Sequence, residues 1–247
     1  MDLVRNWCTE QIPARPEWQD RAYRYESFAE DFMKVMVLTW RGTCNSLDRL
    51  DEASTLIYRK LFEQNVRYLE MSFGAGAYPY EASETLSAFK SNIPEGVTVK
   101  IIAGVSRDRD TEAILEVSRG YVESDALDGV DLHGNETVGD PRSFVDLYET
   151  ARSRGLILKA HAGELCGPES VEQVLDVLRV DRVEHGVRAI ESEDLVRRCA
   201  DEGVTFDVCP WSNVKLGVFP DLKMPISSLQ VMRLNTILYR QHSFYLH

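Results

Sequence analysis

Short β-rich runs alternate with stretches of helical periodicity along this 247-residue chain, and the alternation limits the folds it can adopt. Strands separated by helices at this spacing run parallel and are joined by crossover helices. Both a doubly wound open sheet and a (β/α)8 barrel satisfy such a pattern. The candidate strands are residues 66–73, 97–105, 127–134, 156–161, 182–187 and 204–209, with residues 229–235 as a weaker seventh.

The helical stretches between these strands have recognisable ends. Asp140 can cap a helix that stops before Gly155, and Ser192 can cap one that stops before Gly203. Pro168 suits the first turn of the helix between them, because proline lacks the N–H that a first turn leaves unused. The chain is therefore expected to form an α/β fold.

Polar residues mark the ends of the central strands. Lys159 and His161 lie on one side of their strand because side chains alternate, and Glu184 and His185 close the next strand. A (β/α)8 barrel builds its site from the carboxyl ends of its strands. The pattern thus favours a TIM-type barrel in a single domain over residues 1–247.

Three of the five histidines, His133, His161 and His185, fall near the ends of candidate strands. In a parallel barrel those ends converge on one face. A lone histidine is usually a hydrogen-bonded core residue, but a neutral imidazole is also a good zinc ligand. Their coincidence at three strand ends is more informative than any one of them.

The tetrapeptide HAGE adds a carboxylate to that face. Gly163 allows a sharp turn that would project Glu164 back over the pocket of His161, where a carboxylate can move the proton of a metal-bound water. The alternative is a first-turn glutamate stabilised by the following helix. His185 could orient a bound hydroxide or an anionic intermediate, or serve as a hinge before Gly186.

Two further motifs leave alternatives open. In DLHGNE, Gly134 has no side chain, so a flat ligand could approach its N–H, although a tight turn would use the same residue. In DVCPWSN, Cys209 has no histidine beside it in sequence, which predicts a buried structural cysteine and not a nucleophile.

Composition excludes several partner classes. The formal charge of −12, from 28 basic and 40 acidic residues, disfavours nucleic acid or an anionic membrane as a partner. No stretch is apolar for the roughly 18 residues of a membrane span. The five cysteines are odd in number and dispersed, which predicts a reducing, cytoplasmic location. A small neutral ligand remains compatible with this charge.

The motifs DLHGNE, HAGE, EHG and VCPWSN, in this order and spacing, resemble the adenosine deaminase family of zinc amidohydrolases. The likeness runs from about residue 25 to residue 236. It implies a (β/α)8 barrel, one zinc ion and hydrolytic removal of the 6-amino group from a purine. A small purine nucleoside is the implied partner: adenosine is the default substrate, and adenine and aminofutalosine are handled by relatives.

The resemblance also implies roles for individual residues. His161 matches a zinc ligand, and Glu164 matches the proton donor to purine N1. His185 matches the group that positions the attacking hydroxide, and Gly134 matches the backbone donor to purine N3. These are the catalytic, metal-binding and substrate-binding residues expected of this chain.

The chain departs from the family at both ends. The H-x-H pair of the family's first strand is absent, and no aspartate follows Asp221 where the eighth strand should end in Asp-Asp. His161 is then the one usual zinc ligand present, with His133 or His242 as conceivable substitutes. We expect an incomplete barrel of about seven strands and an atypical tail at residues 237–247, as a truncated or misassembled reading frame would give.

Two other functions satisfy part of the pattern. A protein of the same fold could bind a purine through Gly134, Glu164 and His185, or act as an interaction protein, without catalysis. A different enzyme on this architecture could use Lys159, which faces the side of His161, to form a Schiff base.

Overall fold

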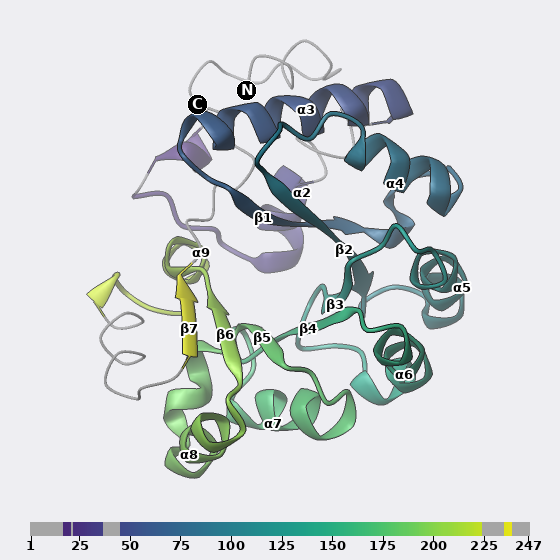
Figure 1. Ribbon diagram of the computed structural model, residues 1–247. Helices are drawn as coiled ribbons and strands as arrows, with labels where there is room; N and C mark the ends of the chain where they lie inside the picture. Colours follow the sequence, from purple (N-terminus) through teal and green to yellow (C-terminus); the bar gives the residue numbers. More distant parts are fainter. Residues whose placement is uncertain (1–16, 21, 37–44, 224–234, 239–247) are drawn as a thin grey trace.

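The computed structural model describes residues 17–20, 22–36, 45–223 and 235–238. Its strands form one parallel sheet whose spatial order follows the chain order, and the sheet curls with helices on its outer side (Figure 1). The sheet starts at β1 and ends at β7, which makes it a (β/α) barrel that is incomplete in the described part of the chain. The strands are β1 (Tyr68–Gly74), β2 (Thr98–Ser106), β3 (Gly129–His133), β4 (Ile157–Ala162), β5 (Arg182–His185), β6 (Thr205–Val208) and β7 (Asn235–Leu238).

Helices follow the strands as the sequence predicts. The longer ones are α3 (Leu47–Glu63), α4 (Ala82–Lys90), α5 (Thr111–Val122), α6 (Val145–Ser153), α7 (Pro168–Val177) and α8 (Glu193–Glu202). The short ones are η1 (Glu17–Gln19), η2 (Phe28–Phe32), α2 (Met33–Met36), η4 (Ala75–Ala77), η5 (Pro141–Phe144), η6 (Val187–Glu191) and α9 (Pro210–Lys215). No helix within these described ranges is long and apolar enough to cross a membrane.

Capping residues define the helix ends. The Ser192 side chain accepts the N–H of Leu195, and Gly203 ends α8 with a φ of 72°. Asp140 also caps as predicted, accepting the N–H of Arg142. The helix it opens starts as the 3-10 turn η5 and becomes α-helical only at Val145.

The apolar core is contiguous and lies between the sheet and its helices. Strand β2 is buried on both faces, with Ile101 and Ile102 fully inaccessible, as expected of a parallel sheet covered on both sides. Leu50 of α3 and Val174 of α7 belong to the same core although they come from distant parts of the chain.

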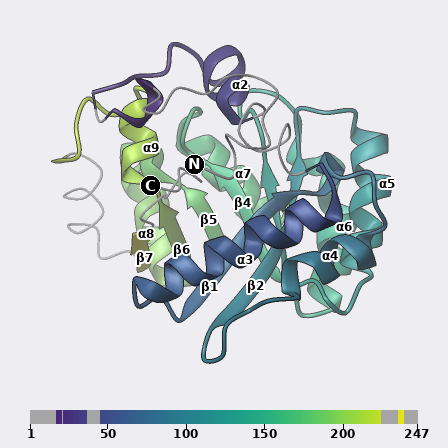
Figure 2. The ribbon, with the colours of Figure 1, turned by 90° about the horizontal axis from the view of Figure 1, so that it is seen from above.

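One end of the sheet is covered by two segments that lie far apart in the sequence, residues 22–36 and helix α9. Helix α9 follows β6 directly, and Figure 2 shows α2 at the same end as α9. The Tyr25 N–H donates to the Lys215 carbonyl at 2.8 Å, which ties the 22–36 segment to the end of α9. This is the end where the strands present their carboxyl termini.

The last strand is described from Asn235 to Leu238. Strand β7 pairs with β6 from Asn235 to Leu238, whereas residues 229–234 of the predicted strand lie outside the described residues. Backbone pairing with β6 holds Ile237 and Leu238 in the sheet, and the atypical tail expected over residues 237–247 stays a prediction. Residues 239–247 of that tail lie outside the described part of the chain.

Candidate active site

The ends of β3, β4 and β5 bring the three predicted histidines together. The ring centroids of His133 and His161 lie 6.4 Å apart, and those of His161 and His185 lie 5.2 Å apart. The convergence predicted from three strand ends is confirmed.

Asp131 orients His161. The His161 Nδ1 lies 3.0 Å from Asp131 Oδ1, and the aspartate is almost inaccessible. Burial lowers the pKa of His161, but the Asp131 carboxylate outweighs it and raises that pKa to about 9. A contact at Nδ1 leaves Nε2 for another partner, which is how a carboxylate orients a metal-binding histidine. Sequence reasoning missed Asp131, although an acidic residue inside an apolar strand was a signal.

Glu164 returns to the same cluster of strand-end residues, where it contacts His185. Gly163 has a φ of 67°, and a Cβ there would lie 2.6 Å from Val171 Cγ2, so the turn requires glycine. Burial raises the pKa of Glu164 to about 7. A carboxyl group with a pKa near neutrality can both hold a proton and release it.

His185 and Asn213 hold the Glu164 carboxyl group. Glu164 Oε1 accepts Asn213 Nδ2 at 3.0 Å and lies 3.1 Å from His185 Nδ1. Burial, and then the nearby His161, lower the pKa of His185 to about 3, so its imidazole is neutral. Near pH 7 the contact with Glu164 is therefore one with a neutral ring and not an ion pair.

Asn213 is the second residue that sequence reasoning missed. It ends the VCPWSN motif and is fully buried in α9. Its Nδ2 lies 3.1 Å from His185 Nδ1, and its Oδ1 has no hydrogen-bond partner among the described residues. The position of Asn213 in a shared motif was the available signal.

Gly134 lies at the end of β3 with a φ of 100°, where a Cβ would lie 2.7 Å from Asp108 Oδ1. Its N–H makes no hydrogen bond within the described part of the chain. The position is thus both a turn that needs glycine and an available donor, so the turn and ligand interpretations are compatible.

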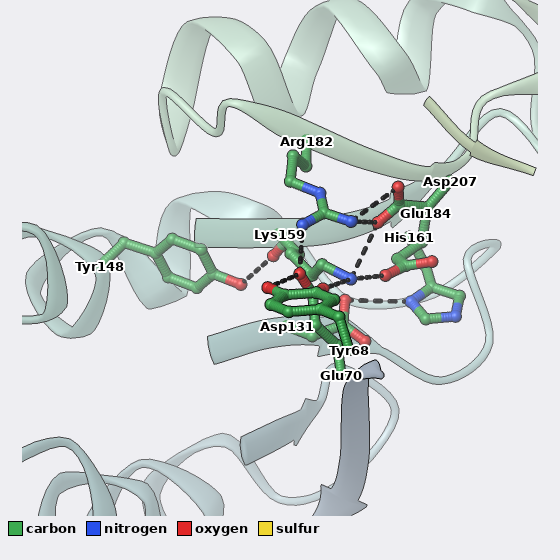
Figure 3. A network of polar contacts seen from close by, with 9 residues as sticks. All are labelled: Tyr68, Glu70, Asp131, Tyr148, Lys159, His161, Arg182, Glu184 and Asp207. Carbon is green, nitrogen blue, oxygen red and sulfur yellow. Dashed lines mark hydrogen bonds and ion pairs between the residues drawn. The ribbon is translucent and has the colours of Figure 1, made fainter. Parts of the chain in front are cut away.

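A buried ionic network surrounds Lys159, which lies two residues before His161 on β4 (Figure 3). The Lys159 Nζ lies 2.9 Å from Glu70 Oε2, 2.6 Å from Glu184 Oε1 and 2.8 Å from Asp207 Oδ2. Arg182 joins it through Glu70 at 2.6 Å and Asp207 at 2.7 Å. An ammonium group held by three carboxylates is charged and a poor nucleophile, which counts against the Schiff-base alternative.

Cys209 is buried, as predicted for a structural cysteine. Burial raises the pKa of its thiol, so the reactive thiolate is disfavoured.

The described residues do not by themselves fit a catalytic zinc ion. Among them, no group of three histidine, cysteine, aspartate or glutamate side chains could hold a metal. Catalytic zinc normally has three protein ligands, and His161 presents one. His133 does not complete the set, and His242 lies outside the described residues.

The comparisons with known proteins identify the family of the chain. The adenosine deaminase family model matches residues 29–238. The chain belongs to the adenosine deaminase family. An adenine deaminase from Chelativorans sp. is 34% identical over 226 residues, which are 81% of this chain and 69% of the relative. An adenine deaminase from Sinorhizobium medicae is 38% identical over 178 residues, 71% of this chain and 54% of the relative.

This adenosine deaminase family member spans about half to two thirds of the length of the curated relatives it matches, from 51% to 69%. Solved structures confirm the fold. An adenine deaminase from Arthrobacter aurescens gives a TM-score of 0.77 at 24% identity and covers 92% of this chain and 72% of its own. An amidohydrolase from Burkholderia ambifaria with bound Zn gives a TM-score of 0.71 at 23% identity. The match covers 82% of this chain and 60% of the amidohydrolase.

Proposed function

We propose that this site binds a 6-aminopurine and that the reaction it serves is hydrolytic deamination. Water adds at C6 of the ring, the bond from C6 to the amino nitrogen breaks, and ammonia leaves. The observation that carries the proposal is Glu164, a buried carboxyl group of pKa about 7 beside the neutral His185 and within the same strand-end cluster as His161.

The proposed roles follow from the protonation states. Protonated Glu164 donates to ring N1 and makes C6 electrophilic. Neutral His185 accepts a hydrogen bond from the attacking water and positions it. The Gly134 N–H donates to N3 and fixes the plane of the ring.

The substrate belongs to the same proposal. Adenosine is the expectation from the motifs, but the curated relatives from Chelativorans and Sinorhizobium are named adenine deaminases. Adenine is therefore tested beside adenosine, by titration calorimetry in the presence of a chelator so that binding is measured without metal.

Two substitutions of Glu164 separate binding from proton transfer. Glu164→Gln keeps a donor for N1 but cannot transfer a proton, so purine binding should persist while any turnover is lost. Glu164→Leu removes the donor and should weaken binding about tenfold. Glu172→Gln, a charge removal on the exposed side of α7, is the control. If neither purine binds at millimolar concentration, the proposal is wrong.

Zinc enters the proposal through His161 as one ligand. Because the described residues offer no set of three ligands, the purified chain should hold less than one zinc ion per molecule by elemental analysis and should deaminate adenosine slowly. Stoichiometric zinc with rapid loss of adenosine absorbance would show that residues outside the described ranges complete the set. Saturable purine binding without turnover would instead favour a binding protein.

A further inference from the structure

Glu136, the last residue of DLHGNE, is a buried carboxylate that accepts five hydrogen bonds. The donors are the four consecutive backbone N–H groups of residues 163–166 and the hydroxyl of Ser170. Three of these bonds reach Oε2, at 2.7 to 3.1 Å. One side chain from the loop after β3 thus accepts hydrogen bonds from four of the five backbone N–H groups in the loop after β4, and Glu169 accepts the fifth, from Gly167.

The carboxylate and the loop depend on each other. A buried charge is costly unless hydrogen bonds replace its water, and consecutive N–H groups converge on one point only when the backbone is curved. Gly163, with its φ of 67°, supplies the curvature. Arg107, also buried, donates to the His161 carbonyl at 2.6 Å and so holds the strand end that precedes the loop.

We infer that Glu136 is a positioning residue that fixes the 163–166 loop so that the Glu164 carboxyl group meets His185 and Asn213. The inference rests on the proposed function for its link to purine. Glu136 lies two residues after Gly134, so a single loop carries the proposed donor to N3 and the anchor of the proposed donor to N1. Glu136 would therefore set the spacing between the two ring contacts.

The test is Glu136→Gln. The amide places an N–H₂ group where at least two donors need an acceptor, so part of the loop loses its partner. Amide hydrogen exchange of residues 163–166 should become about tenfold faster, as expected when a buried donor is left unpaired. Glu172→Gln carries the same chemical change on exposed α7 and should leave the exchange of the loop unchanged.

Purine affinity separates positioning from mere stabilisation. The purine Kd is measured at a temperature where the variant is fully folded. If Glu136 only stabilises the fold, the variant has a lower melting temperature and an unchanged Kd. If Glu136 positions the loop, the Kd of the variant is about tenfold higher. Ser170→Ala removes one of the five donors and should raise the Kd by a smaller factor. This variant replaces Glu136→Gln in the test if Glu136→Gln does not fold.

The two proposals fail in different ways. If the wild-type chain binds no purine, the proposed function is wrong, and the exchange measurement still decides whether Glu136 holds the loop. If the wild type binds purine but Glu136→Gln changes neither loop exchange nor Kd relative to Glu172→Gln, the positioning role is overturned.

Discussion

At the residue scale, burial has shifted the pKa of Glu164 from its ordinary value. Its side chain accepts a hydrogen bond from Asn213 and contacts His185, but neither partner is a cation near pH 7. Desolvation is the larger effect and raises its pKa to about 7, against the lowering influence of the nearby His161. The same burial that equips it for proton transfer makes its charged form costly to the fold.

That cost predicts a pH dependence of stability. Between the ordinary glutamate pKa of 4.5 and the folded value of about 7, the native state keeps a proton that the unfolded state has released, so raising the pH favours unfolding. Wild-type stability should fall relative to Glu164→Gln across this window by at most about 1.4 kcal/mol per pH unit. Urea unfolding of both proteins from pH 5 to pH 8 measures the difference, and parallel curves would contradict it.

Lys159 is the cation shared by three buried carboxylates in the barrel interior. Lys159→Met leaves Glu184 without its ammonium partner and Glu70 and Asp207 with Arg182 alone, and it should cost about 3–5 kcal/mol of unfolding free energy at pH 7. Part of the loss should return at acidic pH, where carboxylates become neutral. Lys100→Met, which breaks a partly exposed pair with Asp128, should cost about 1 kcal/mol or less, and equal losses would refute the argument.

At the scale of the element, the strand-to-helix turns decide where the site residues point. After β5, Gly186 has a φ of 62°, and a Cβ there would lie 2.1 Å from Phe206 Cδ1 of β6. This turn leaves His185 in a left-handed conformation, with a φ of 64°, and its ring centroid 5.2 Å from that of His161. The direction of His185 therefore depends on close packing between β5 and β6.

Gly186→Ala tests this packing against a matched glycine. Gly203 has a similar φ of 72° but nothing within 4 Å of an added Cβ, so Gly203→Ala should cost roughly 1–2 kcal/mol for the backbone alone. Gly186→Ala should cost at least about 2 kcal/mol more, because Phe206 must move. Thermal unfolding of the two variants gives the comparison. Similar melting temperatures would show that the turn yields without strain.

At the scale of the whole molecule, a single contiguous core joins the helices from α3 to α8 to the strands from β1 to β6. The single domain expected from the sequence remains a prediction. It requires that secondary structure and side-chain packing be lost together, in one transition followed by far- and near-ultraviolet circular dichroism. Two separated transitions would divide the chain into independently folding parts.

The sequence by itself determined the order of strands and helices, their capped ends, the meeting of three histidines and the family. Periodicity, capping and turn chemistry act over a few residues, so they can be read without knowing distant neighbours. A pattern of this kind also predicts that Gly163 turns the chain and that Glu164 returns over His161, as the structure shows.

Only the tertiary structure decided which side chains pair and which are charged. Asp131 meets His161 from 30 residues away, Asn213 meets Glu164 from 49, and Lys159 meets Glu184 from 25. No local rule joins residues at such separations. Protonation follows the same logic, because burial and neighbouring charges exist only once the strands have brought these groups together.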